Sequence, residues 1–149
     1  MYSTDILRPD LPRAEFEAAL ARVMTADRCV LTTEEAGAPV HALVAATLAY
    51  FHSNDDDDGA ERLARLELVL AAMPGADAAV AQDILGTLVR ESDFTVRSNA
   101  RFTRILQAFK AAGQTQRIDR SFAFSTRDEL ERKGQNRLER AWFENVLRP

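Results

Sequence analysis

The chain has 149 residues, of which 46% are hydrophobic and 28% charged, and its formal net charge at pH 7 is −4. This composition is ordinary for a soluble globular protein, and a chain of this length needs no disulfide or metal to fold, because it buries roughly 68–70% of its unfolded surface. Cys29 is the only cysteine, which excludes an intramolecular disulfide and a multi-cysteine zinc site and fits a reducing compartment.

No segment has the pattern of an export signal or a membrane span. Residues 1–10 carry charges and lack the apolar run that a secretory signal requires. The longest apolar stretch, residues 36–51, is interrupted by Gly37, Pro39 and His41 and is shorter than the roughly 20 residues of a spanning helix. We therefore expect a cytoplasmic protein without a membrane partner.

The first helix is predicted from Asp10 onward. Asp10 can cap free backbone amides, and Pro12 fits the first helical turn because its missing N–H would have no partner there. Apolar residues then recur three and four positions apart, which places them on one buried stripe. They are Phe16, Ala19, Leu20, Val23 and Met24.

The next two segments differ in how clearly they can be interpreted. Residues 28–33 are rich in side chains that suit a strand, but a short strand needs a partner, so strand and helix both stay open. Residues 39–53 fit a helix that is apolar on most faces and belongs in the middle of a bundle. Its apolar side chains include Val40, Leu43, Val44, Leu48 and Phe51.

Four consecutive aspartates, Asp55–Asp58, precede Gly59 and the next helix. Carboxylates at a helix start accept from free backbone amides and face the positive end of the helix dipole. Interpreted as an EF-hand, the loop fails at its twelfth position, which holds Arg65 where a bidentate Glu is needed. The helix, Asp-Gly loop and helix also resemble the tellurite-resistance TerB-type domain, but Glu61 and Glu67 do not match the position of that family's acid. We therefore predict that the aspartates cap the helix and form no metal site. Weak binding of a divalent ion is the alternative.

Two further helices are predicted at residues 77–91 and 100–112, joined by a link at residues 92–99. Met73, Pro74 and Gly75 end the preceding helix, and Gly113 ends the later one. In the later helix Phe102, Ile105, Leu106 and Phe109 form the buried stripe. Arg97, Arg101 and Arg104, spaced by four and three, fall on one neighbouring face.

After Gly113 the pattern changes. Residues 114–124 predict a short extended or wing-like segment, because apolar and polar residues alternate in their last part. A capping box of Thr126 and Glu129 then begins a last helix to about Val146, with Gly134 as a weak point. The predicted fold is all-α or mainly α, a compact bundle of five to six helices in which residues 1–149 form a single domain.

The chain offers no motif for catalysis or for a cofactor. His41 and His52 lie about three helical turns apart, so they cannot share a metal ion within one helix. Cys29 stands beside Val30 and Leu31, in the apolar surroundings of a buried cysteine. No phosphate-binding loop, dinucleotide motif, nucleophile elbow or zinc-protease motif occurs. We therefore expect a protein that is not an enzyme and has no cofactor.

Charge is divided unequally along the chain. Residues 1–89 hold fifteen Asp and Glu against six Lys and Arg, a net charge of −9, and residues 90–149 hold eight against thirteen, a net charge of +5. Such an asymmetry indicates a charged partner. The partner is either nucleic acid or protein, and different residues would contact each.

The nucleic-acid interpretation uses residues 80–124. Their order of helix, turn, cationic helix, glycine and extended segment resembles, in outline, the helix-turn-helix and wing of winged-helix regulators. The resemblance implies that Arg97, Arg101 and Arg104 contact the major groove of double-stranded DNA, and that Arg117 and Arg120 contact its flanking backbone. A solvated helix face carries arginines in the same way.

The protein interpretation uses complementary fields, which favour a head-to-tail homo-oligomer or docking on another protein. Trp142 and Phe143 are candidate anchors or, equally, core residues; adjacent positions of one helix cannot both point inward, so partial exposure is expected. We expect a non-enzymatic regulatory or adaptor protein that binds another macromolecule, in the first place a protein. The alternative is a DNA-binding transcriptional regulator.

Overall fold

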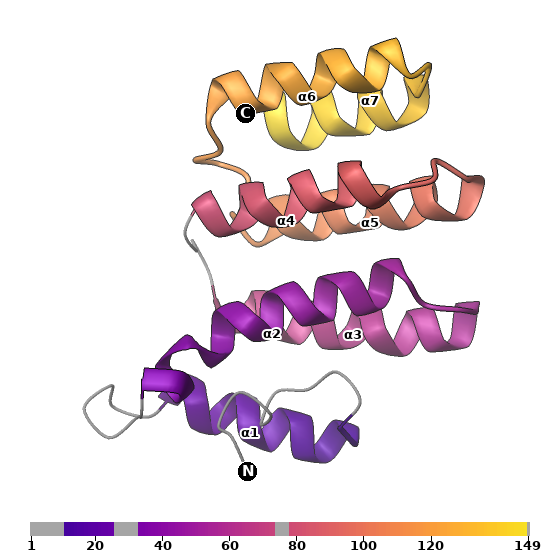
Figure 1. Cartoon of the computed structure of the whole chain (residues 1–149). Helices are drawn as coiled ribbons and strands as arrows, with labels where there is room; N and C mark the ends of the chain where they lie inside the picture. Colours follow the sequence, from indigo (N-terminus) through magenta and orange to yellow (C-terminus); the bar gives the residue numbers. More distant parts are fainter. Residues whose placement is uncertain (1–10, 26–32, 74–77, 149) are drawn as a thin grey trace. The chain divides into compact units, whose positions relative to one another are not determined.

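The computed structural model describes residues 11–25, 33–73 and 78–148, with side chains given from Gly37 in the second range. Within these ranges every regular element is a helix (Figure 1), which confirms the predicted all-α class. The chain divides into two compact units, Met1–Met73 and Pro74–Pro149. The segment interpreted as strand or helix, residues 28–33, lies outside the described residues except for Thr33, which begins a helix.

Unit 1 contains α1 (Arg13–Thr25), α2 (Thr33–Phe51) and α3 (Asp56–Ala72). A short turn joins α2 to α3, so the two helices lie side by side and antiparallel, and α1 packs against both (Figure 1). In α1 the predicted stripe is confirmed, since Phe16, Leu20 and Val23 are buried. The predicted central helix is also present as α2, with Leu43 fully buried but Val40 exposed.

Unit 2 contains four α-helices and a terminal π-helix. They are α4 (Ala78–Glu91), α5 (Val96–Ala111), α6 (Arg120–Arg132), α7 (Asn136–Trp142) and the π-helix η3 (Phe143–Leu147). Helices α6 and α7 lie side by side, and α5 packs against α7 and η3 (Figure 1). The core includes the predicted stripe of α5, Phe102, Ile105, Leu106 and Phe109.

Helix α5 begins earlier than the sequence predicted, at Val96 rather than near Ala100. The backbone N–H of Ser98 donates to Thr95 Oγ1 at 3.2 Å, and Ser98 Oγ donates to Asp93 Oδ1 at 2.7 Å. The polar residues interpreted as a link are therefore the capping residues of the helix. Asn99, inside its first turn, donates through Nδ2 to Gln135 Oε1 at 3.0 Å.

The predicted extended or wing-like segment at residues 114–124 is not present. Residues 112–117 form a turn, and residues 120–124 are the first residues of α6. Asp119 accepts the backbone N–H of Phe122 at 3.2 Å and so starts a helix in the middle of the expected strand. The spacing of four between Ile118 and Phe122 is as typical of a helical turn as of an alternating strand.

The last predicted helix is in fact two helices, α6 and α7. Gly134 has a φ of 71° and ends α6, with the backbone N–H of Gln135 donating to Leu130 O at 2.9 Å. Gly113, at φ 75°, ends α5 with the same pattern of hydrogen bonds. The predicted capping box is wrong, because Thr126 is buried in the middle of α6.

Two glycine substitutions should shift stability in opposite directions. Gly134→Ala places a side chain at φ 71° and should lower the free energy of unfolding by about 1 kcal/mol, because an L-residue is strained there. Gly37→Ala lies within α2, where the nearest atom to the new Cβ is His41 Cδ2 at 4.0 Å, and should raise it by about 0.5–1 kcal/mol. Urea denaturation followed by circular dichroism measures both, and equal shifts would contradict the assigned backbone.

The cap of α5 should make stability depend on acid pH. Hydrogen bonds from the Ser98 hydroxyl and then the Thr95 backbone lower the pKa of Asp93 from its usual 3.8. Because the folded pKa lies below the unfolded one, this stabilisation is present above pH 3.8 and is lost as the pH falls through the folded value. Asp93→Asn should therefore reduce the fall in Tm below that pH, measured by thermal melts. Asp83→Asn, an exposed carboxylate of α4, is the control and should melt like the wild type.

Candidate partner-binding face

Trp142 of α7 packs against α6. Its side chain is completely buried, and its indole Nε1–H donates to Ala123 O at 2.9 Å. Its ring meets Phe122 edge to face, with centroids 5.9 Å apart. The structure therefore places one of the two predicted aromatic anchors in the core of unit 2, where a partner cannot reach it.

Phe143 follows Trp142 directly and lies at the surface, 43% exposed. The chain continues from it as the π-helix η3, in which the backbone N–H of Arg148 donates to Phe143 O at 2.8 Å. Asn145 Nδ2 donates to Ala141 O at 2.7 Å, in the place where an α-helix would use the Asn145 backbone N–H. Single π-turns are rare and often occur at functional sites.

A second exposed phenylalanine lies on α6. Phe124 is 44% exposed, and the guanidinium carbon of Arg120 lies 5.2 Å from its ring centroid. The guanidinium of Arg127, two turns along the same helix, lies 5.6 Å from the ring centroid of Phe143. Each exposed ring therefore carries an arginine over its face, in cation–π geometry.

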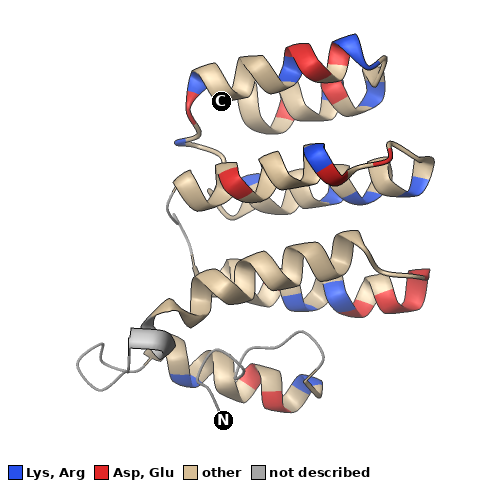
Figure 2. Ribbon diagram, viewed as in Figure 1, with Lys and Arg blue, Asp and Glu red and all other residues tan. Residues whose placement is uncertain are grey.

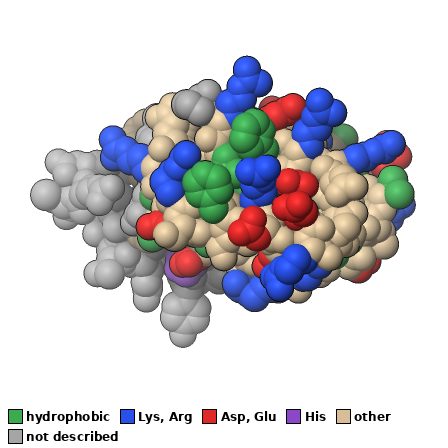
Figure 3. Space-filling view, turned by 90° about the horizontal axis from the view of Figure 1, so that it is seen from above, with side chains coloured by type: hydrophobic (Ala, Val, Ile, Leu, Met, Phe, Trp, Pro, Cys, Tyr) green, Lys and Arg blue, Asp and Glu red, His purple; other side chains and the backbone are tan. Residues whose placement is uncertain are grey.

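We call the surface that these residues share the α6–α7 face. It consists of Arg120, Phe124, Arg127, Asn136, Glu139, Arg140 and Phe143. Figure 3 looks down on this side of unit 2 and shows hydrophobic side chains gathered in the middle, with basic and acidic side chains around them. An apolar centre with a charged rim is the usual anatomy of a protein interface.

An open pocket of about 240 Å³ lies in this face beside Phe143. Its other lining residues are Arg127, Asn136, Glu139 and Arg140. Arg127 Nε contacts Glu139 Oε1 at 3.2 Å, whereas Arg140 is 3.7 Å from Glu144 Oε1 with a side chain that is 82% exposed. The lining offers hydrogen-bond donors, one carboxylate and an aromatic wall, so it can hold a polar side chain of a partner.

The structure does not bring the five predicted arginines together. Arg101 is buried at 7% exposure, and it and Arg97 already interact with other groups of the chain. Arg97 is in the first turn of α5 and Arg117 follows its last turn, so roughly 21 Å of helix lies between them along the chain. Arg104 donates to Gln107 Oε1, and only Arg120 belongs to the α6–α7 face.

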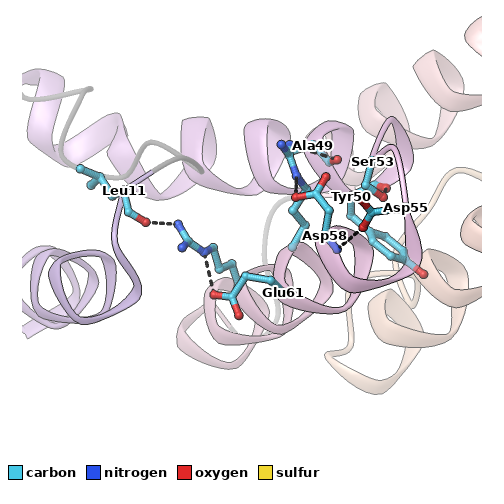
Figure 4. Close-up of polar contacts among 9 residues, drawn as sticks. Leu11, Ala49, Tyr50, Ser53, Asp55, Asp58 and Glu61 are labelled. Atoms are coloured by element: carbon cyan, nitrogen blue, oxygen red, sulfur yellow. Dashed lines mark hydrogen bonds and ion pairs between the residues drawn. The ribbon is translucent and has the colours of Figure 1, made fainter.

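The predicted capping is confirmed, but α3 begins at Asp56, before the predicted start after Gly59, so three of the four aspartates lie in its first turn. Asp55 Oδ1 accepts the backbone N–H of Asp58 at 2.7 Å, and Asp58 accepts from Arg62 Nε at 2.9 Å (Figure 4). Figure 2 shows the carboxylates gathered at this helix end. Arg65, at the failed EF-hand position, is buried and bonds Glu61 and the carbonyl of Leu11.

The described residues give no support to a metal site or a membrane-spanning helix. No group of three or more His, Cys, Asp and Glu in those ranges is placed to hold a metal ion. His41 and His52 are both exposed. None of the described helices has both the length and the apolar character that crossing a membrane requires.

Compared with protein-family models, curated proteins and solved structures, the chain matches none. Sequence reasoning selected Phe143 and Arg120 but missed Phe124, Arg127 and Arg140. The missed signal is the spacing of Arg120, Phe124 and Arg127, which are four and three residues apart and share one face of a helix.

The two neighbouring aromatic residues should respond differently to truncation. Trp142→Ala should lower the free energy of unfolding by about 3–5 kcal/mol, because it empties the core and breaks the bond to Ala123. Phe143→Ala should lower it by less than about 1 kcal/mol, because only a half-exposed ring and one cation–π contact are lost. Urea denaturation measures both, and a large loss for Phe143→Ala would show that its ring belongs to the core.

Proposed function

We propose that this chain is a non-enzymatic regulatory or adaptor protein of the cytoplasm that binds another protein through the α6–α7 face. The observation that carries the proposal is the pair of half-exposed phenylalanines, Phe124 and Phe143, each lying under an arginine guanidinium. Large apolar side chains this exposed are few in the described residues, since the others are Val40 and Val96.

The chemistry of the face supports a protein partner. Aromatic residues and arginine are enriched in protein interfaces and among the residues that dominate binding energy. A guanidinium stacked on a ring keeps its N–H edges for carboxylates or carbonyls of a partner, and stacking limits the conformations that binding must freeze. The pocket beside Phe143 adds a place for one partner side chain.

The DNA-binding alternative remains a prediction to which no further observation adds weight. The segment expected to be its wing is a turn and a helix, and its arginines are spread along α5 with Arg101 buried. Duplex DNA binding at low salt, falling steeply as salt rises, would support that alternative over the present proposal.

The proposal predicts that partner capture depends on the two exposed rings. The immobilised wild-type chain should retain a defined protein from a lysate of its source. The double variant Phe124→Ala/Phe143→Ala should capture at least about tenfold less of that protein, because hot-spot aromatic residues each contribute about 2 kcal/mol or more to binding. The double variant should remain folded by circular dichroism.

Val96→Ala is the matched control, because Val96 is an apolar side chain of unit 2 that is 90% exposed and lies at the start of α5. It should capture as well as the wild type does. Equal capture by the wild type and the double variant would remove the α6–α7 face as the binding surface.

A further inference from the structure

The division of charge follows the division of the fold. Residues 1–73, which form unit 1, hold thirteen Asp and Glu against six Lys and Arg, a net charge of −7. Residues 74–149, which form unit 2, hold ten against thirteen, a net charge of +3. Each copy of the chain therefore presents one acidic unit and one basic unit, so its two units carry complementary surfaces.

Unit 1 offers carboxylates that the fold does not use. Asp55 caps α3 and Asp58 pairs with Arg62, whereas Asp56 and Asp57 are exposed. These two make no hydrogen bond or ion pair with any described residue through their side chains. Both residues belong to α3, whose buried side chains Leu66, Val69 and Leu70 pack it against α2 and α1. The two carboxylates are therefore carried by a helix that is held in the core of unit 1.

Unit 2 offers cations at the edge of the α6–α7 face. Arg137 is exposed and makes no side-chain hydrogen bond or ion pair with the described residues. Arg140, one turn later on α7, has an 82% exposed side chain and a single long contact of 3.7 Å to Glu144. Arg140 lines the pocket together with Phe143, and Arg137 lies one turn before it on α7, so a carboxylate that reaches Arg140 also approaches the apolar centre.

We infer that the α6–α7 face binds the acidic start of α3 from a second copy of this chain. The inference rests on the proposed function, since it names the partner of the same face. Asp56 and Asp57 of one copy contact Arg137 and Arg140 of the next, while Phe124 and Phe143 become covered. Exposed ion pairs are individually weak, so the two rings supply the rest of the affinity.

The contact joins two different surfaces and is therefore heterologous. A bound pair of copies still has one free acidic start of α3 and one free α6–α7 face, so assembly continues until it closes a ring or grows as a filament. Mass should accordingly rise with protein concentration. Long-range attraction between opposite charges also makes the assembly sensitive to salt.

Light scattering on the full chain tests the inference. At about 0.1 M salt, where charges act over roughly 10 Å, the weight-average mass should rise above the 16.6 kDa of one chain. At about 1 M salt, where they act over roughly 3 Å, the mass should return toward that of one chain. The variants Asp56→Asn/Asp57→Asn and Arg137→Gln/Arg140→Gln should each weaken association about tenfold.

Mixing the two double variants gives the decisive result. One keeps an intact basic face and the other keeps an intact acidic start of α3, so the mixture should form pairs of chains that grow no further. Glu67→Gln on α3 and Arg104→Gln on α5 are controls that shift the charge in the same directions, each by one unit rather than two. Both residues are exposed, and both variants should assemble like the wild type.

The outcomes separate this inference from the proposed function. A wild-type chain that stays monomeric at every salt and concentration, or one whose variants assemble unchanged, overturns the inference. If a monomeric chain still captures a different protein and loses it on Phe124→Ala/Phe143→Ala, the proposed function stands and its partner is not a second copy. A mixture that forms only paired chains supports both.

Discussion

The hydrogen bond from Trp142 Nε1 to the carbonyl of Ala123 fixes how α7 lies against α6. A buried indole N–H left without an acceptor would destabilise the core, so the ring can be buried only in a register that brings Ala123 to it. That register places Phe143 beneath Arg127 and lets Arg120 reach the carbonyl of Leu147 at 3.3 Å. The packing of Trp142 in the core therefore determines which residues lie together on the surface that we propose binds a partner.

The same arrangement explains why neighbouring residues have different roles. Trp142 is fully buried and Phe143 is nearly half exposed, although both are large aromatic side chains. Their order along the helix assigns the larger ring to stability and the other to the surface. Arginines then lie over the exposed rings, which reduces the apolar area that water meets while leaving polar edges for contacts.

Sequence patterns anticipated the elements that bury an apolar stripe. Phe102, Ile105, Leu106 and Phe109 recur at helical spacing over two turns, and all four are buried in the structure, as that spacing predicts. The capping role of the aspartates at the start of α3 was also predicted correctly, because a cap acts locally. The fold class followed from these elements.

The failures lie where local signals allow two structures. Ser98 and Asn99 are typical of both loops and first helical turns, and the hydrogen bonds that they donate to Asp93 and Gln135 favour the helix. Residues 118–124 allow strand or helix until Asp119 caps α6 and Trp142 packs against it. The candidate site was harder still, since no pattern in the sequence says that Arg127 and Phe143 meet across two helices.

The π-helical turn at the C-terminus sets the phase of the chain beyond Trp142. The Asn145 side chain donates to Ala141 O, and the π-turn adds one residue to the turn, so that Leu147 is buried as well as Val146. In an ordinary α-helix Val146 would still share the face of Trp142, four residues before it, but Leu147 would lie about 140° around the helix from that ring. The π-turn thus allows an exposed ring, Phe143, and two buried aliphatic side chains, Val146 and Leu147, to occur within five consecutive residues.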